Sequence, residues 1–343
     1  MKTDNVILVC GGAGYIGAHV VRALIAAGHS TVVIDDLSTG HKASVPDSVP
    51  LICGSVGDRV LLDGVFAQYP IKAVIHLCAS SLVAESVQEP LKYYRNNVAN
   101  GLVLLESMLA HDIRTIVFSS TAAVYGHPQF TPLTEDHPTC PVSPYGWSKL
   151  TFEQMLHDFG LAYGSRWVSL RYFNAAGAAA DGSIGEDHQP ESHLIPLVLK
   201  AALRIEHQEL AERLPETLKV FGSDYPTPDG TCVRDYIHVC DLAYAHLLAL
   251  DYLQAGKTSA VFNLGNGSGF SVKEVIQACR TVTGLPIEYE IAERRPGDPP
   301  ELVSDSSLAQ RELGWTAAHP DLDQIVRSAW SFHQRFPCGL PSE

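Results

Sequence analysis

A tyrosine and a lysine stand four residues apart in the segment Tyr145-Gly-Trp-Ser-Lys149, directly after Pro144. Proline suits the first turn of a helix, and residues four apart lie on one helix face, so the two side chains should be neighbours. A lysine ammonium favours phenolate and lowers a tyrosine pKa that is ordinarily about 10. Tyr145 is therefore a candidate general base near neutral pH. Taken alone, the same spacing also fits an exposed helix pair without a catalytic role.

A second candidate is the glycine-rich turn Gly11-Gly-Ala-Gly14-Tyr-Ile-Gly17, which follows an apolar run and opens a helical pattern. Small residues let a backbone turn tightly and approach a pyrophosphate at a helix N-terminus. Asp35 and Asp36 follow about 20 residues later, where a carboxylate suits a ribose 2′-hydroxyl. An acid at this place, rather than an arginine, favours NAD over NADP. The glycine spacing is a variant of the usual one, and the alternative is a turn that binds nothing.

Alternating short β-branched runs and helical patterns should position these residues. We expect strands at 6–10, 31–34, 73–77, 115–118 and 167–173, and helices at 15–27 and from Pro90 to about His111. Such alternation is typical of βαβ units. The sequence therefore predicts the α/β class, with a Rossmann-type doubly wound parallel sheet and a smaller C-terminal α/β lobe.

The pattern changes after about residue 175, where Pro and Gly become frequent and helices are expected at 194–206, 239–253 and 272–283. We predict a dinucleotide-binding domain over residues 1–175, to which segments near 235–265 return. A smaller substrate-binding lobe is predicted to span mainly 176–343. Ligands of open α/β sheets bind at the carboxyl edge, so the site should lie between these two parts.

Charge and cysteine usage exclude several classes of protein. The 343 residues carry 24 Lys and Arg against 38 Asp and Glu, a formal charge of −14 with no basic run, which disfavours nucleic acid and anionic membranes as partners. No apolar stretch approaches the roughly 20 residues of a membrane helix, and the N-terminus does not resemble a signal peptide. Eight cysteines without CxxC pairs indicate a reducing, cytoplasmic location.

The fifteen histidines raise the question of a metal. His188 and His193 flank Glu191, but the spacing matches no compact ligand set. We expect no metal here, and histidines that are solvated or face a substrate.

The chain resembles the extended short-chain dehydrogenase/reductase family essentially end to end. The resemblance is carried by the glycine loop at 11–17, Asn96-Asn97-Val98, Phe118-Ser-Ser-Thr-Ala-Ala-Val-Tyr125, Tyr145 with Lys149, Arg171-Tyr-Phe-Asn174, Gly185-Glu-Asp187, Gly230-Thr-Cys-Val-Arg-Asp-Tyr-Ile-His238, Asn263-Leu-Gly-Asn266 and Arg294-Arg-Pro-Gly-Asp298. Within the family, the chain is similar to enzymes that epimerise UDP-hexoses at C4. The resemblance also implies a homodimer, in which the helix from about Pro90 and the helix near Tyr145 pack against their copies.

The resemblance implies a reaction in which UDP-glucose and UDP-galactose interconvert. Tyr145 would take the proton from the sugar 4-hydroxyl as hydride leaves C4 for NAD. Lys149 would contact the nicotinamide ribose, and Thr121 would bond the same sugar oxygen as Tyr145. The 4-keto sugar would then turn, and hydride would return to its opposite face.

The implied contacts divide between cofactor and substrate. The implied cofactor-binding residues are Gly11, Gly14, Tyr15, Ile16, Gly17, Asp35, Asp36, Ser55, Val56, Leu77, Cys78, Ala79, Asn96, Ser119, Tyr145, Lys149 and Tyr172. The implied substrate-binding residues are Thr121, Tyr145, Phe173, Asn174, His193, Leu194, Phe221, Arg234, Arg295, Asp298 and Leu302.

Some positions depart from the family pattern and leave alternatives open. The loop Ala79-Ser80-Ser81-Leu82 lacks a lysine that many members carry, and Ser55-Val56 and His193 replace an acid and an asparagine. Leu302 occupies the hexose gate and is intermediate in size, so we expect weak or absent turnover of UDP-N-acetylhexosamines. A UDP-N-acetylhexosamine or UDP-pentose 4-epimerase remains an alternative, as does a non-catalytic dinucleotide sensor. A 4,6-dehydratase is disfavoured, because Ala122 and Ala123 cannot transfer protons.

Overall fold

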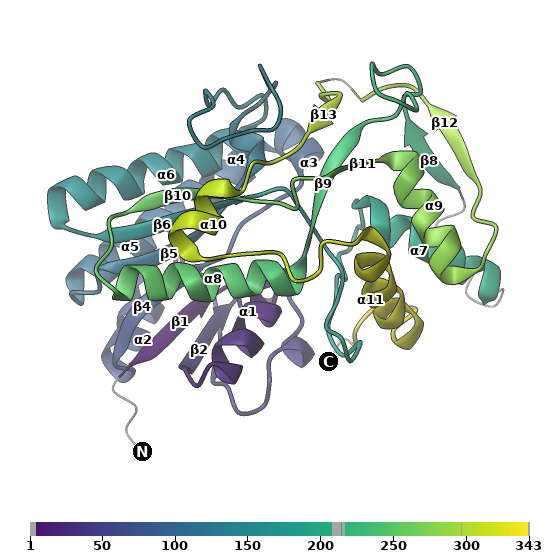
Figure 1. Cartoon of the computed structure of the whole chain (residues 1–343). Coiled ribbons are helices and arrows are strands. Elements are labelled where there is room, and N and C mark those ends of the chain that lie inside the picture. The colour runs from purple at the N-terminus through teal and green to yellow at the C-terminus, as the bar shows by residue number, and fades with distance from the viewer. Residues whose placement is uncertain (1–4, 208–213, 215–216, 296, 342–343) are drawn as a thin grey trace.

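A parallel sheet of seven strands forms the centre of the computed structural model, which describes residues 5–207, 214, 217–295 and 297–341. The strand order is β10-β6-β5-β4-β1-β2-β3 (Figure 1). The strands are β1 (Val6–Cys10), β2 (Ser30–Asp35), β3 (Leu51–Cys53), β4 (Ile71–His76), β5 (Thr115–Thr121), β6 (Arg166–Tyr172) and β10 (Ala260–Leu264). Because β1 pairs with both β2 and β4, the strand order reverses beside it, which confirms the doubly wound α/β class.

Both faces of the sheet are covered, which explains why its strands are continuous apolar runs. Alternate residues of β1 enter two separate cores. Ile7 and Val9 pack toward α1 (Tyr15–Ala26) and α8 (Val239–Gln254). Leu8 packs in the core beneath α2 (Arg59–Gln68), α5 (Asn100–Ala110) and α6 (Pro144–Tyr163).

A second region forms around β9 (Val233–His238), to the right in Figure 1. Strand β9 pairs with β7 (Asn174–Ala176), β11 (Gly269–Ser271) and β13 (Glu301–Leu302). Strand β8 (Leu218–Phe221) pairs with β12 (Tyr289–Ala292). Helices α7 (Leu194–Glu206), α9 (Val272–Thr283) and α11 (Leu322–Arg335) share an apolar core. The chain passes between the two regions more than once. After β9 it returns to the first region, where α8 lies against α1 and β10 pairs with β6.

The strands and most of the helices expected from the sequence are present, but the helix from Pro90 to His111 is not continuous. It divides into α4 (Pro90–Tyr93), a π-helical turn η2 (Tyr94–Ala99) and α5. Within the turn, the buried side chain of Asn97 bonds both backbone groups of Ser80 and the hydroxyl of Ser148. A π-helical turn of this kind often marks a functional site.

Several short elements were not expected from the sequence. They include β3, α2, α3 (Val83–Gln88), α10 (Ser307–Leu313) and the 3₁₀ turns η1 (Lys42–Ser44) and η3 (Ala122–Val124). Among the described residues, no helix combines enough length with enough apolar side chains to span a membrane.

Candidate active site

The glycine loop between β1 and α1 is packed too closely for larger residues. A Cβ on Gly17 would lie 1.9 Å from the carbonyl oxygen of Gly11. Gly11 itself has φ +84°, and a Cβ there would lie 2.8 Å from the backbone nitrogen of Cys78. Without side chains at these glycines, the backbone at the start of α1 is open to a ligand. A pyrophosphate needs such an opening to approach a helix N-terminus closely.

The two aspartates at the end of β2 have different surroundings. Asp35 is buried, and its carboxylate accepts hydrogen bonds from the backbone N–H groups of Ala13 and Leu37, each at 2.9 Å. Burial raises the pKa of Asp35, although these bonds oppose the rise. Asp36 is exposed and caps the following turn at Ser38. Asp35 therefore fixes the glycine loop, while Asp36 is accessible to a ligand.

A groove runs from the glycine loop past these aspartates. Its lining includes ten of the predicted cofactor-binding residues: Gly11, Gly14, Asp35, Asp36, Ser55, Val56, Leu77, Cys78, Ala79 and Asn96. Ser38, Thr39 and Gly54 also line it and were missed, although their positions beside Asp36 and Ser55 in the sequence could have indicated them. Bare glycines, a helix N-terminus and an exposed carboxylate fit a dinucleotide.

Seven predicted cofactor residues do not line this groove, and three of them belong to the first turn of α1. Ile16 and Gly17 lie in the first turn of α1, and the Tyr15 hydroxyl donates to the carbonyl of Gly177 at 2.7 Å. Burial raises the pKa of Tyr15 well above its ordinary value. Tyr15 thus connects the glycine loop to the second region.

Tyr145 and Lys149 lie on the buried side of α6, where the sequence spacing placed them. Helix α6 begins at Pro144, and the hydroxyl of Ser143 caps it by accepting from the N–H of Gly146 at 3.2 Å. Tyr145 lies close enough to Thr121, at the end of β5, for this side chain to lower the pKa of the phenol. The three predicted catalytic side chains therefore meet beyond the carboxyl end of the parallel sheet.

Lys149 is anchored to β5 as well. Its Nζ donates to the carbonyl oxygen of Ser119 at 2.7 Å and lies 4.9 Å from the centre of the Phe118 ring. Burial lowers the pKa of Lys149 to about 7, despite the opposing influence of Cys78 and Glu153. The Ser119 hydroxyl also contacts the hydroxyl of Tyr172, which adds both predicted cofactor residues to the cluster.

The expected lowering of the Tyr145 pKa by Lys149 is not found. Burial raises that pKa, and only Thr121 opposes the rise. The lysine amine is directed to Ser119, and its lowered pKa leaves it only partly protonated near neutral pH. Its positive charge therefore does not offset the desolvation of the phenol.

A buried ion pair that the sequence reasoning missed supports this cluster. Arg171 on β6 donates to both carboxylate oxygens of Glu153 on α6, at 3.0 and 2.6 Å. The same carboxylate accepts from the hydroxyl of Ser120, next to Thr121. Glu153 is one helical turn beyond Lys149, which is the signal that could have indicated it.

Most of the predicted substrate-binding residues gather around β9 and β13. Arg234 pairs with Asp298, and the Arg295 guanidinium lies 4.1 Å from the centre of the Phe221 ring. Leu302 lies opposite Arg234 in the β13–β9 ladder. Leu302 and Phe173 both pack against the small apolar cluster formed by Ala122, Val124, Tyr125 and Leu133, directly after Thr121.

Asn174, by contrast, already makes a hydrogen bond within the protein, because its side-chain amide donates to the carbonyl oxygen of Asp235 at 2.9 Å. His193 and Leu194 lie at the start of α7. His193 contacts Glu186, and that carboxylate raises the pKa of His193 to about 9. Burial alone would raise the pKa of Glu186. The influence of His193 and His188 is larger and lowers the pKa of Glu186 to about 2.

The histidines near Glu191 also differ from expectation. Glu186, His188, Glu191 and His193 bring ligand-type atoms within 4.8 Å of one another. The expectation that this segment holds no compact set of ligand-type residues is therefore wrong. The loop doubles back before α7, which brings together residues whose spacing fits neither a helix nor a strand.

Comparison with known proteins gives matches over almost the whole chain. A UDP-glucose 4-epimerase of Halalkalibacterium halodurans is 52% identical over 337 residues, which are 98% of each chain. A crystal structure of a UDP-glucose 4-epimerase superposes with TM-score 0.94 at 47% identity and covers 98% of this chain and 100% of its own. A Bifidobacterium longum UDP-glucose 4-epimerase in complex with NAD+ and UDP has TM-score 0.90 at 39% identity, with coverage of 98% and 100%.

The sequence profile of one protein family matches residues 7–265, from β1 through the glycine loop and the Tyr145 cluster to the end of β10. The matched region includes the groove and the residues that meet at Thr121. The chain belongs to the NAD dependent epimerase/dehydratase family.

Proposed function

We propose that this protein interconverts UDP-glucose and UDP-galactose, with NAD as its bound cofactor. The observation that carries the proposal is the buried cluster of Thr121, Tyr145 and Lys149 at the carboxyl end of β5. Around it lie a groove suited to a dinucleotide and a second region that offers two arginines. The relatives named as UDP-glucose 4-epimerases support the same reaction.

Bound NAD supplies a hydride acceptor for the sugar C4 and a positive charge beside Tyr145. The Tyr145 phenolate, beside Thr121, accepts the proton of the sugar 4-hydroxyl to become the phenol, and the phenol later returns this proton. Thr121 holds the same sugar oxygen. Because burial alone raises the pKa of Tyr145, its ionisation depends on the charge that arrives with the cofactor.

We assign to Lys149 a contact with the nicotinamide ribose, and its buried position supports this assignment. Its bond to Ser119 fixes the amine on the strand that also carries Thr121. The lysine therefore orients the cofactor relative to the phenol, and a charged amine strengthens the preference for phenolate.

The second region anchors the nucleotide, which leaves the hexose able to turn. Guanidinium groups make charge-assisted contacts to phosphate, and we assign these to Arg234 and Arg295. Asp298 takes a ribose hydroxyl, and Phe221 lies near uracil. Asn174, His193 and Leu194 complete the UDP side, while Phe173 and Leu302 border the sugar.

The purified protein should be assayed against UDP-glucose, UDP-galactose, their N-acetyl forms and UDP-pentoses. We expect conversion of UDP-galactose to UDP-glucose and of UDP-glucose to UDP-galactose without added NAD, together with an absorbance from co-purified cofactor. Turnover of other UDP-sugars but not of UDP-glucose would contradict the proposed substrate. Failure to retain or bind NAD would contradict the cofactor.

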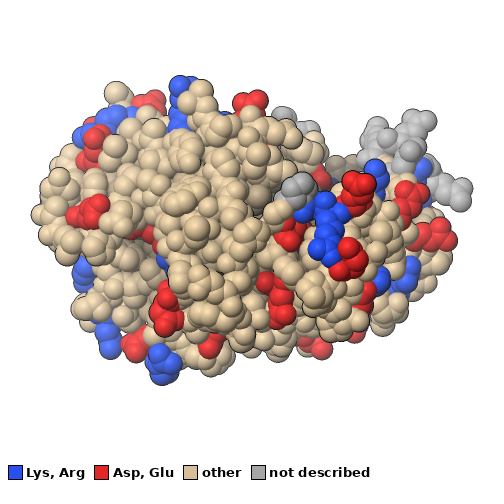
Figure 2. Space-filling view, turned by 90° about the horizontal axis from the view of Figure 1, so that it is seen from above, with Lys and Arg blue, Asp and Glu red and all other residues tan. Residues whose placement is uncertain are grey.

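We further propose that the protein is a homodimer joined through α6 and the helical segments before it. Apolar side chains are exposed there although nothing covers them within the described chain. Val87 on α3 is 63% exposed, Leu91 on α4 is 67% exposed and Trp147 on α6 is 44% exposed. Figure 2, seen from above relative to Figure 1, shows few charged side chains over much of this side of the molecule. Exposed apolar patches of this kind mark interaction sites.

Sedimentation should then give twice the mass of 37.2 kDa. The double variant Val87→Lys/Leu91→Lys should shift the protein toward monomer at micromolar concentration. Ile291→Lys is the matched control, because Ile291 is 50% exposed on β12, away from α6. A monomeric wild-type protein, or an unchanged dimer in the double variant, would contradict this interface.

We also propose a cytoplasmic location, because none of the eight cysteines forms a disulfide in the described structure. Cell fractionation with a tagged chain tests this, and recovery in a secreted fraction would contradict it.

A further inference from the structure

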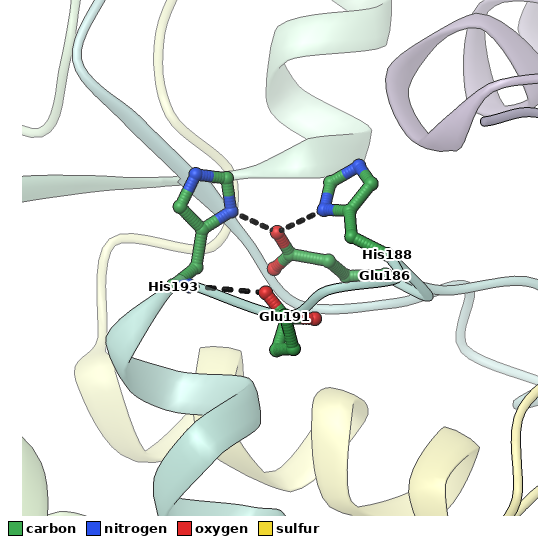
Figure 3. Close-up of side chains that lie close together, drawn as sticks. All are labelled: Glu186, His188, Glu191 and His193. Atoms are coloured by element: carbon green, nitrogen blue, oxygen red, sulfur yellow. Dashed lines mark hydrogen bonds and ion pairs between the residues drawn. The ribbon is translucent and has the colours of Figure 1, made fainter. Parts of the chain in front are cut away.

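The loop that leads into α7 gathers two histidines and two glutamates around one point. Figure 3 shows the imidazoles of His188 and His193 on either side of Glu186, with Glu191 below them. One ligand-type atom from each of the four lies within 4.8 Å of all the others. This cluster has no role in the proposed proton and hydride chemistry.

The orientation of the imidazoles is informative. The Nδ1 atoms of His188 and His193 both point at Oε1 of Glu186, and for His188 the separation is 3.3 Å (Figure 3). Two ligands of a tetrahedral zinc ion with bonds of about 2.0–2.1 Å lie roughly 3.3 Å apart. The His188–Glu186 pair already has this separation, whereas His193 Nδ1 contacts the same oxygen more closely, so its imidazole would have to move away to admit an ion.

Glu191 provides an independent indication of a missing partner. Its side chain is only 4% exposed. Oε1 accepts from the backbone N–H groups of Ser192 and His193, at 2.8 and 3.0 Å. Oε2 is buried without a hydrogen-bond donor among the described residues, and its nearest cation, Lys200 Nζ, is 3.8 Å away. A buried carboxylate oxygen without a donor is costly, and a metal ion would satisfy it.

We propose that Glu186, His188, Glu191 and His193 bind one Zn²⁺ ion. Two imidazole nitrogens and two carboxylate oxygens are ligands that zinc accepts, and the two carboxylate charges balance the charge of the ion. All four ligands come from the protein, which is typical of a structural rather than a catalytic zinc site.

The ion would hold the loop 186–193 closed where the two regions of the molecule meet. The Tyr15 ring lies 6.3 Å from that of His188, and Asp187, inside the loop, accepts from the backbone of Leu340 at 2.7 Å. A bond from His193 Nδ1 to zinc would leave Nε2 as an N–H donor at the start of α7. The site would thus fix the orientation of this imidazole.

The holoenzyme should be treated with a chelator, dialysed and titrated with ZnCl₂. Bound zinc should be measured by elemental analysis, and the midpoint of thermal unfolding should be recorded in parallel. We expect one zinc per chain and a higher midpoint, because an ion that binds only the folded chain stabilises it. His188→Gln and Glu191→Gln should each lose the zinc and the thermal shift.

His111→Gln is the matched control, because His111 Nε2 lies 3.3 Å from Asp63 but belongs to no group of three or more ligand-type side chains among the described residues. That variant should keep one zinc per chain. The proposal would be overturned if the wild-type protein took up no zinc. It would also be overturned if His188→Gln and Glu191→Gln took up as much zinc as the wild-type protein.

X-ray absorption of the zinc-loaded wild-type protein provides a second measurement that does not depend on the variants folding. The proposal predicts only nitrogen and oxygen ligands at about 2.0–2.2 Å. Sulfur ligands at about 2.3 Å would place the ion on cysteines elsewhere and overturn the assignment.

Discussion

The Nζ atom of Lys149 lies 2.7 Å from the carbonyl oxygen of Ser119, so the lysine of α6 is bound to the strand that ends at Thr121. This bond accompanies the burial of Lys149, which is 3% exposed. One consequence is a lysine with a pKa of about 7, lowered by burial. The proposed catalytic cluster therefore carries a buried lysine, which costs the folded state some stability.

That cost should appear as a pH dependence of stability. The pKa of Lys149 is about 7 in the folded chain and about 10.4 when unfolded. Between these values the unfolded chain binds more protons, so Lys149 makes the free energy of unfolding rise with pH across this window. Below about pH 7 the penalty is fully present. Urea unfolding of cofactor-free protein between pH 7 and 8.5 measures the slope.

Lys149→Met should flatten that slope relative to the wild-type protein. Lys72→Met, at an exposed position of β4, serves as the control and should keep the wild-type slope. Equal slopes for the wild type and Lys149→Met would show that Lys149 is not desolvated as described.

Gly17→Ala should abolish retention of NAD, because the added Cβ would lie 1.9 Å from the carbonyl oxygen of Gly11 and displace the glycine loop. The absorbance spectrum of the purified protein reports the retained cofactor. Gly64→Ala in α2 is the control, since a Cβ there meets nothing within 4 Å. It should retain NAD and gain about 0.5–1 kcal/mol of stability from helix propensity. A Gly17→Ala protein with a full complement of NAD would refute this role of the loop.

Glu153→Gln should destabilise the protein by about 3–5 kcal/mol, because it leaves the buried guanidinium of Arg171 without a counter-ion. Denaturant unfolding measures the change. Asp63→Asn removes the more exposed pair with Arg59 and should cost much less stability, because water screens that pair. If the two variants lost similar amounts of unfolding free energy, burial would not explain the contribution of the Glu153–Arg171 pair to stability.

The parts of the site that local spacing controls could be predicted from the sequence. The glycine turn, the acids after β2 and the four-residue spacing of Tyr145 and Lys149 each depend on one strand–turn–helix segment. Their environment could not be predicted in the same way. The pKa of Tyr145 depends on burial between α6 and β5, and this burial outweighs the influence expected from Lys149.

Two other features depend on contacts that a linear pattern does not reveal. The helix from Pro90 widens at Asn97 because that side chain bonds Ser80 and Ser148, which are distant in sequence. The loop before α7 brings Glu186 and His193 together through a turn without regular periodicity. Neither hydrophobic periodicity nor motif spacing reports such tertiary contacts.

Leu302 should restrict the size of the sugar, since it packs beside Phe173 next to the residues that follow Thr121. We expect UDP-N-acetylglucosamine to be turned over weakly or not at all by the wild-type protein. Leu302→Ala should increase kcat/KM for this substrate relative to UDP-glucose, by roughly tenfold if a few methyl-sized groups are removed. Comparable kcat/KM values for both substrates in the wild-type protein would contradict this steric role.

Tyr145→Phe tests the central claim most directly, because it removes only the hydroxyl that lies beside Thr121. Tyr93→Phe is the matched control, since the ring of Tyr93 lies 6.4 Å from that of Tyr145 but its hydroxyl bonds Leu82 and Glu85 instead. The measurement is the rate of conversion of UDP-galactose to UDP-glucose, with retained NAD quantified on the same samples. The account predicts that Tyr145→Phe retains NAD and loses about 10²–10⁴-fold in kcat, while Tyr93→Phe remains close to the wild type. Near-normal turnover by Tyr145→Phe with NAD bound would contradict it.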